Sequence, residues 1–250
     1  MNSRHLFREV VVVWLATMVA IRVIATFLTG VAWDIGLVLV PFLFMYVPVW
    51  VLAWRGDDPD RYPLTVPLWE APSAHLPALT LVAKVIALIL VPYVLGYHLW
   101  QTWGVPAVLG VACDAGVEAA CVTWKTPVPR LRLPPDVVML ALYHLIFVAL
   151  PEELFYRGYI QTRLDEVWPP SWTVFGARVG PGLLVTCVIF AVGHSIVQFQ
   201  YWHLAIVFPS LIFGWMRAKT GDILAGAWFH AFCNVSVAIL DASYGLVGPQ

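Results

Sequence analysis

Apolar residues in this chain come in blocks of about twenty, and this pattern constrains the fold more than any other feature. The stretch 35–54 carries no charged side chain and is long enough to cross a bilayer as a helix. Over the whole chain 61% of residues are hydrophobic and 12% are charged, with a mean hydropathy of +0.81. Because soluble domains have about a quarter charged residues, these values exclude a soluble globular enzyme, a disordered tail and a secreted disulfide-rich mini-protein. The sequence predicts a multi-pass integral membrane protein.

We predict an all-α fold, a polytopic membrane helical bundle of about seven to eight transmembrane helices that forms one integral membrane domain over 1–250. The N-terminal spans occupy about 10–100, and the helices of the second half occupy about 136–242. The Gly- and Pro-rich connection 101–135 contains an apolar stretch that either lies in the interface or re-enters as an eighth, half-length span. The seven predicted spans are 10–32, 35–54, 76–100, 136–160, 181–200, 202–218 and 222–242.

The charged residues indicate orientation rather than a charged partner. With 14 Lys and Arg against 15 Asp and Glu, the chain has no basic surface for nucleic acid. Cations at the span ends place the N-terminus in the cytoplasm and the C-terminus outside, in a bacterial-type cell membrane. Lys125, Arg130 and Arg132 disagree with this arrangement, and Arg22 and Lys84 lie within spans, where a charge is costly. The cations that share the predicted cytoplasmic side are Arg4, Arg8, Arg55, Arg61, Arg163, Arg178, Arg217 and Lys219.

The four cysteines form no CxxC pair and no disulfide framework. Cys113 and Cys121 share one connection and could pair if it faces an oxidising compartment, but two free thiols are the favoured expectation. Cys187 and Cys233 lie in apolar segments and are expected to be small packing residues.

Two adjacent glutamates, Glu152 and Glu153, follow Pro151 in an apolar context. Pro151 is expected to kink the helix and widen the space around it. Adjacent helical residues point about 100° apart, so the two carboxylates have different surroundings. Arg157 follows Glu153 by four residues, the spacing of an ion pair on one helix face, which leaves Glu152 to face the interior. The alternative is a helix end at which all three side chains are solvated.

Two later apolar segments carry aligned polar residues. Phe190 and His194 share a helix face in FAVGHS, and His230 and Asn234 share one in WFHAFCN. A lone histidine in a membrane helix often only bonds to a neighbouring helix, so His194 alone is weak evidence. Two polar side chains one turn apart need a polar partner across the interface. The second segment therefore favours a functional site.

Together these segments supply the parts of a hydrolytic site: a carboxylate, two imidazoles and a carboxamide. Glu152 suits a general base that activates water, and His194 shares the proton or orients the water. His230 and Asn234 are expected to donate hydrogen bonds to the oxygen of a tetrahedral intermediate.

The motifs EExxxR (Glu152 to Arg157), FxxxH (Phe190 to His194) and HxxxN (His230 to Asn234) occur in this order. The chain thereby resembles the CAAX protease and bacteriocin-processing (ABI) family of intramembrane endopeptidases, and is similar to type II CAAX prenyl endopeptidases. The resemblance covers about 140–240. It implies peptide-bond hydrolysis near the C-terminus or membrane segment of a membrane or lipidated protein. In this reading Glu153, Arg157 and Phe190 support the catalytic residues.

Two alternatives stay open. Glu152, His194 and His230 could form a two-His, one-carboxylate zinc site, although the chain has no HExxH motif. We favour a metal-free, glutamate-type mechanism without a cofactor. The chain could instead be a non-catalytic immunity or partner protein, in which Arg22 and Lys84 mark a transport path. Neither substrate prenylation nor oligomeric state follows from the sequence.

Overall fold

The computed structural model describes residues 3–27, 31–64, 72–114, 128–198 and 201–246, and these are almost entirely helical. The predicted all-α membrane bundle is confirmed. The elements are α1 (Ser3–Phe27), α2 (Val31–Arg55), the 3₁₀ turn η1 (Pro59–Arg61), α3 (Pro72–Leu99), the π-helical η2 (Trp100–Gly104), α4 (Val105–Asp114), α5 (Val137–Tyr143), the π-helical η4 (His144–Ala149), α6 (Leu150–Glu153), the π-helical η5 (Leu154–Gln161), α7 (Thr162–Val167), β1 (Trp172–Val174), β2 (Ala177–Val179), α8 (Pro181–Gln198), the 3₁₀ helix η6 (Tyr201–Ile206), α9 (Val207–Thr220) and α10 (Leu224–Tyr244).

Within the described ranges, 5 helices are long and apolar enough to cross a membrane: Ser3–Phe27, Val38–Arg55, His75–Gly110, Val137–Val167 and Leu224–Tyr244. The predicted spans 181–200 and 202–218 correspond to shorter helices. α8 is apolar over Pro181–Val197, and α9 has 14 residues, a length of about 21 Å. α9 is short because the 3₁₀ turns of η6 precede it and Gly221, at a φ of 83°, ends it. A glycine at this left-handed position is the usual helix stop.

The connection after the third span differs from its prediction. η2 and α4 continue α3 as one apolar helix as far as Asp114, so the described part of this stretch is an extension of the third span, and the rest of it lies outside the described residues. Cys113, near the end of α4, is disulfide-bonded, so the expectation of a free thiol at this position was wrong. Cys121 lies outside the described residues. Cys187 and Cys233 form no disulfide with the residues that the structure describes, and Cys187 is buried.

The chain divides into two compact units. The first combines Met1–Val82 with Leu142–Ala231, and the second combines Ala83–Ala141 with Phe232–Gln250. A single domain over 1–250 stays a prediction.

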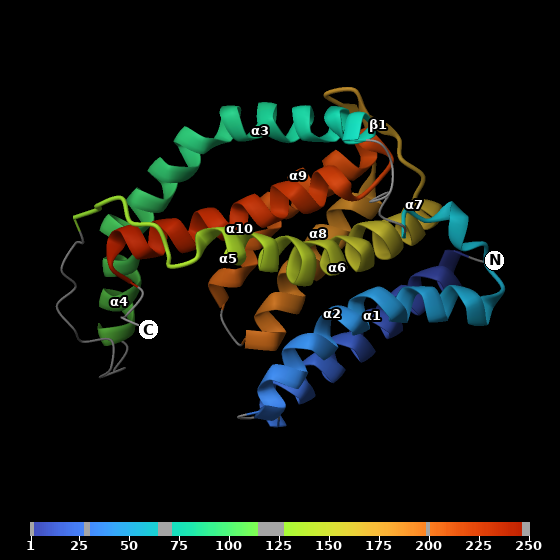
Figure 1. Ribbon diagram of the computed structural model, residues 1–250. Helices are drawn as coiled ribbons and strands as arrows, with labels where there is room; N and C mark the ends of the chain where they lie inside the picture. The colour runs from blue at the N-terminus through green and yellow to red at the C-terminus, as the bar shows by residue number, and fades with distance from the viewer. Residues whose placement is uncertain (1–2, 28–30, 65–71, 115–127, 199–200, 247–250) are drawn as a thin grey trace. The chain divides into compact units, whose positions relative to one another are not determined.

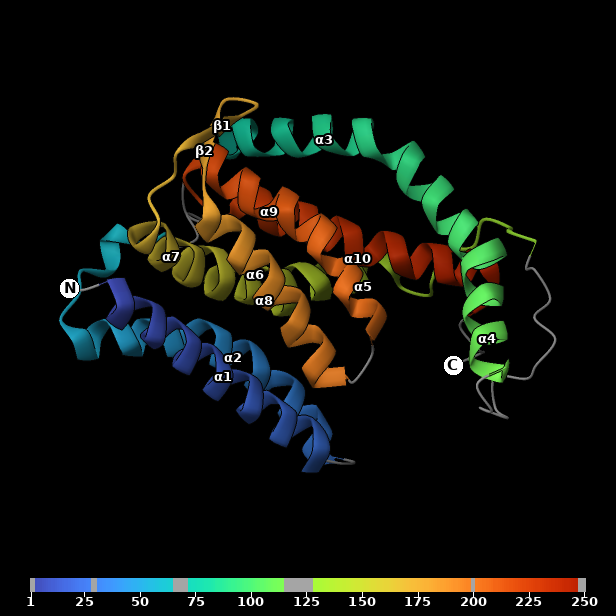
Figure 2. The same cartoon turned by 180° about the vertical axis from the view of Figure 1, so that it is seen from behind.

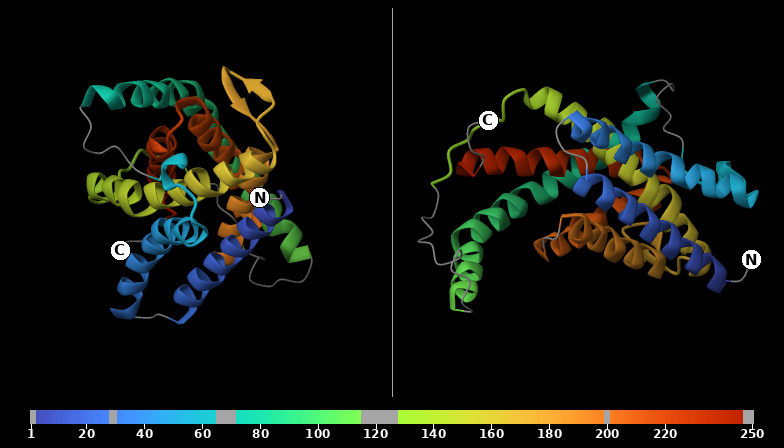
Figure 3. Two further views of the ribbon diagram at one scale, coloured as in Figure 1. Left: turned by 90° about the vertical axis from the view of Figure 1, so that its right-hand side faces the viewer. Right: turned by 90° about the horizontal axis from the view of Figure 1, so that it is seen from below.

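In the first unit α1 and α2 form an antiparallel helical hairpin (Figures 1 and 2). α8 packs against α1, α7 and α9. The antiparallel strands β1 and β2 pair Trp172 with Val179 and connect α7 to α8 (Figure 3). The core of this unit is aromatic, and its fully buried rings are Phe155, Tyr156, Tyr159, Phe190, Phe213 and Phe229.

The helix that carries the two glutamates runs without a break from Val137 to Val167. Pro151 was expected to kink it. α6 continues through the proline, and wider π-helical turns, η4 and η5, lie on both sides, so the expected kink stays a prediction. Because proline removes one backbone donor, the neighbouring turns adjust their hydrogen bonds, and π turns occur often at functional sites.

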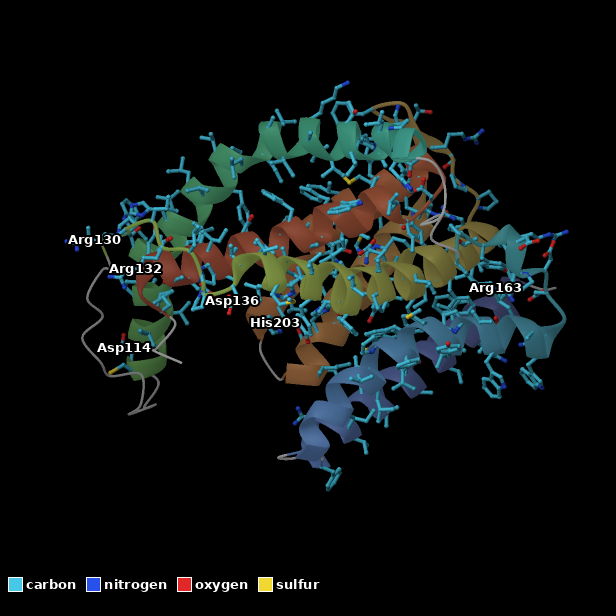
Figure 4. All side chains as sticks on the ribbon, in the orientation of Figure 1. Asp114, Arg130, Arg132, Asp136, Arg163 and His203 are labelled. Atoms are coloured by element: carbon cyan, nitrogen blue, oxygen red, sulfur yellow. The ribbon has the colours of Figure 1, made fainter. Side chains whose placement is uncertain are left out.

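Arg163 of α7 is at the centre of an ion-pair network at one end of the first unit (Figure 4). Its Nε lies 3.2 Å from Glu9 Oε1, its Nη1 lies 3.2 Å from Glu166 Oε2, and its Nη2 pairs with Asp57. Arg55 Nη2 lies 2.8 Å from the other Glu9 oxygen, Oε2. Arginines from α2 and α7 that were predicted to share one side of the membrane therefore meet.

Tyr62 and Arg217 extend this polar end. Burial raises the pKa of Tyr62, so its hydroxyl is protonated and donates a hydrogen bond to Glu166 at 2.9 Å. Arg217, in the last turn of α9, contacts Asp165 at 2.9 Å. Every one of these arginines has a carboxylate partner.

The second unit has its own polar contacts. Tyr97 bonds to Asp241, and the Tyr244 hydroxyl lies 2.6 Å from His98 Nδ1. The extended segment with Arg130 and Arg132, labelled in Figure 4, is tied to Ser243 through the backbone amides of both arginines, at 2.9 and 3.0 Å.

Candidate active site

Glu152, in α6, faces two imidazoles that come from segments far apart in the sequence. Its Oε2 lies 3.7 Å from His194 Nε2 in α8 and 3.8 Å from His230 Nε2 in α10. The Glu152 side chain is 13% exposed, and its Oε2 is buried without a hydrogen-bond partner among the described residues. A buried polar atom without a partner is costly and is typical of a site that receives a ligand or water.

The His194 ring has a fixed orientation. Its Nδ1 lies 3.0 Å from the backbone carbonyl oxygen of Phe190, one turn earlier. Because a carbonyl oxygen only accepts, Nδ1 is the donor and Nε2 of the neutral ring has a lone pair directed to the Glu152 side. The Phe190 ring also contacts the edge of the imidazole, with centroids 4.5 Å apart.

His230 is held on both sides. Its Nδ1 lies 3.0 Å from Glu153 Oε1, and its ring stacks on Phe213 at 4.7 Å with an interplanar angle of 14°. Each ring nitrogen of His230 therefore faces a carboxylate, Glu153 on one side and Glu152 on the other.

Glu153 and Arg157 form the ion pair that their spacing predicts. Arg157 Nη1 lies 2.9 Å from Glu153 Oε1, and both side chains are 0% exposed. Arg157 Nη2 also donates to Ser210 Oγ at 2.7 Å. The guanidinium lies over the Phe190 ring, 4.3 Å from its centroid. The solvated helix end considered from sequence is therefore wrong, because this pair is part of the core.

Two local features of α9 and α10 place His230 against Glu153. Asp222 Oδ1 accepts a hydrogen bond from the Leu224 amide at 2.8 Å and so caps the start of α10. Gly226 lies against the carboxylate, since a Cβ at this position would come within 2.9 Å of Glu153 Oε2. The glycine gives Glu153 the space to reach His230, one turn further along α10.

The structure brings together six of the seven predicted residues: Glu152, Glu153, Arg157, Phe190, His194 and His230. Asn234 lies one turn after His230 along the same face of α10. It belongs to the second compact unit, and its role stays a prediction.

The sequence analysis missed three residues that contact this cluster. Ser210 binds Arg157, and Phe213 stacks on His230. His203, labelled in Figure 4, packs edge-on against His194 with ring centroids 6.3 Å apart. A serine within an apolar helix was a usable signal for Ser210, but nothing in the sequence distinguishes Phe213 from other buried aromatic residues.

The zinc alternative can be compared with this geometry. Ligand atoms of a tetrahedral zinc with bonds of about 2.0–2.1 Å lie about 3.3 Å apart. The distances from Glu152 to the two imidazoles, 3.7 and 3.8 Å, are longer. Among the residues that the structure describes, no group of three or more His, Cys, Asp and Glu side chains is arranged so that it could hold a metal ion. These separations are longer than those of a closed zinc site, and the choice between the metal-free and the zinc mechanism stays a prediction.

Comparison with known proteins supports the recognition made from the motifs. Residues 134–236 match the family model of type II CAAX prenyl endopeptidases, Rce1-like. All three motifs lie within the matched segment, so the family resemblance is confirmed there. The match points to protease activity, and with the five apolar helices it indicates an integral membrane protein. Searches of curated proteins and of solved structures each returned no significant match.

Proposed function

We propose that this chain, with its Rce1-like segment 134–236, is a glutamate-type intramembrane endopeptidase. It hydrolyses a peptide bond near the C-terminus or the membrane segment of a membrane or lipidated protein. The observation that carries the proposal is the buried Glu152 carboxylate, which faces two imidazole nitrogens and has no Lys or Arg within 4 Å among the described residues. A buried ionisable group of this kind indicates chemistry rather than scaffolding.

Glu152 is the general base in this proposal. A water held between its Oε2 and His194 Nε2 gives a proton to the carboxylate as the water oxygen attacks the peptide carbonyl. His194 accepts the second hydrogen bond of this water, because its Nδ1–H is already committed to the Phe190 carbonyl. The proton then passes from Glu152 to the leaving amine, so that the carboxylate is regenerated.

His230 and Asn234 stabilise the oxyanion of the tetrahedral intermediate. The Asn234 amide donates in every protonation state, whereas His230 Nε2 donates when the ring carries both protons. Glu153, 3.0 Å from His230 Nδ1, accepts a hydrogen bond from that nitrogen and fixes the orientation of the ring. Arg157 neutralises Glu153 and fixes it in place, so this buried pair is the support for the histidine.

The cluster of arginines at one end of the first unit supports an orientation with the N-terminus in the cytoplasm. A prenylated C-terminal peptide is the substrate class that the matched family's description suggests.

The zinc-dependent version of the same reaction is the second candidate. Each of the two imidazoles has its Nδ1 against an oxygen acceptor, an arrangement that is also typical of metal-ligating histidines.

The experiment is cleavage of a peptide panel by the purified full chain in lipid. The panel contains prenylated CAAX peptides, unmodified CAAX peptides and transmembrane tails, each with and without a chelator. Glu152→Gln is compared with Glu166→Gln, the same substitution in the same helix at a 40% exposed side chain away from the site. We expect cleavage by the parent and by Glu166→Gln, none by Glu152→Gln, and no effect of the chelator.

Three results would change this proposal. Loss of activity on chelation, restored by one zinc per chain, replaces the glutamate mechanism with the metal mechanism. Equal cleavage by Glu152→Gln removes Glu152 as the base. No cleavage of any peptide, with a biological phenotype that survives Glu152→Gln, supports the non-catalytic immunity or partner role.

A further inference from the structure

A cavity lies between α1 and α2, on the side of α1 that faces away from the candidate active site. Its volume is about 760 Å³, within the range of ligand-binding pockets. Met18 of α1 contacts the Tyr156 hydroxyl at 3.5 Å and so packs toward the catalytic core. The cavity lies on the other face of the helix, and its apolar wall consists of Val12, Val13, Ala16, Ala20, Leu43, Val47, Trp50, Val51 and Trp54.

Features of both helices favour this space. α2 contains two internal prolines, Pro41 and Pro48, each of which removes a backbone hydrogen bond of the helix. On α1, Ala16 and Ala20 are one turn apart and present only methyl groups to the cavity. From His5 to Ala20 the wall of α1 extends about 22 Å at 1.5 Å per residue, which is more than half the thickness of the hydrocarbon core.

One end of the cavity is cationic. His5, Arg8, Glu9 and Arg55 line it, and they lie where α1 begins and α2 ends. Glu9 is already bound by Arg55 at 2.8 Å, by Arg163 at 3.2 Å and by the Tyr159 hydroxyl at 3.1 Å. Its charge is therefore not free to neutralise the rest of the mouth.

Arg8 is a cation at this mouth that has no ion-pair partner among the residues that the structure describes. Arg8 and His5 are exposed, and neither has a hydrogen bond or ion pair with the residues that the structure describes. Trp50 and Trp54, 69% and 73% exposed, flank the same end, as tryptophans do at the level of lipid headgroups. A long apolar groove with an unpaired arginine at its mouth matches a molecule that has a hydrocarbon chain and a negatively charged head.

We propose that this groove binds an anionic phospholipid, with an acyl chain between α1 and α2 and the phosphate at Arg8. The charge at the mouth selects this occupant over the isoprenoid chain of a substrate, because an isoprenoid carries no charge for an arginine to pair. The bound lipid fills the space between α1 and α2 and so supports α1, whose other face packs on the catalytic core.

The test is native mass spectrometry of the full chain released from nanodiscs that hold equal amounts of dioleoyl phosphatidylglycerol and dioleoyl phosphatidylcholine. Arg8→Gln removes the headgroup contact, and Ala16→Trp fills the groove. Arg61→Gln is the control for charge, because Arg61 is an exposed arginine outside the cavity wall. Val19→Trp is the control for bulk, because Val19 is 60% exposed and also outside that wall.

We expect one phosphatidylglycerol retained per parent chain, about five-fold less retention by Arg8→Gln, and almost none by Ala16→Trp. Both control variants should behave as the parent. Equal retention of the two lipids, or retention that is unchanged by Ala16→Trp, overturns the proposal. The proposal is also overturned if a farnesylated peptide displaces the lipid and if Ala16→Trp cleaves unmodified peptides normally but no longer cleaves the farnesylated one. That pair of results assigns the groove to the substrate.

Discussion

Two buried charged clusters of the first unit differ in how completely their charges are matched. At the end of the bundle, Arg163 meets three carboxylates, and Glu9 meets two arginines. In the candidate active site Glu153 has its arginine, but the adjacent Glu152 faces only two imidazoles, beyond hydrogen-bond distance. The matched cluster holds helices together, whereas the unmatched carboxylate is available to a water molecule. The lack of a Lys or Arg partner, rather than burial of a carboxylate itself, distinguishes Glu152 from the scaffold carboxylates.

The largest expected effect separates the two adjacent glutamates. Glu152→Gln keeps the shape of the side chain and removes the base, so we expect kcat to fall by about 10²- to 10⁴-fold with thermal unfolding unchanged. The measurement is peptide cleavage together with an unfolding curve in the same detergent. If Glu152→Gln instead unfolds at a clearly lower temperature than the parent, Glu152 stabilises the fold, and the two adjacent glutamates do not differ in role as described.

Arg157→Ala should lower the stability of the folded protein. It leaves Glu153, which is 0% exposed, without its countercharge, and we expect a loss of about 3–5 kcal/mol of unfolding free energy. Equilibrium unfolding in mixed micelles measures this loss. Arg157→Lys keeps the charge and serves as the matched variant. If both variants unfold like the parent, the buried pair does not support the site as described.

Asn234→Ala tests the fourth proposed catalytic residue. Loss of one oxyanion donor should lower kcat by about 10²- to 10³-fold with KM little changed. Steady-state kinetics on the best peptide of the panel measure both constants. Parent-like kinetics would remove Asn234 from the reaction.

Arg163→Ala should give the smallest effect. Asp57 and Glu166, two of its partners, are 35% and 40% exposed, so water replaces part of the lost interaction, and we expect a loss of about 2 kcal/mol of stability. The kcat of the folded fraction should stay within about two-fold of the parent, since general acid–base groups are untouched. A large loss of kcat in folded protein would show that the two clusters are coupled.

Helical spacing predicted contacts that lie on one helix. The Glu153–Arg157 pair follows from a separation of four residues, and the divergent surroundings of Glu152 and Glu153 follow from the angle between adjacent residues. The family motifs located the histidines. None of these patterns could predict that Glu153 also binds His230 or that Ser210 anchors Arg157, because those contacts depend on how different helices pack.

Hydropathy was less informative about length. It predicted full spans at 181–200 and 202–218, where a 3₁₀ segment and the Gly221 stop shorten the helices. The charge of Arg22 within a span raised the possibility of a transport path. In the structure Arg22 donates to the Val197 carbonyl at 2.6 Å, near the end of α8, which is a structural use for that charge.

A double-mutant cycle between Glu152 and His194 tests the central claim most directly. If both side chains act on one water, then Glu152→Gln, His194→Ala and the double variant should show nearly the same residual kcat, because removal of either group disables the unit. The account predicts this strong non-additivity in chelated buffer, with all variants folded. Losses that multiply in the double variant would show that the two residues act independently, and would contradict the shared-water mechanism.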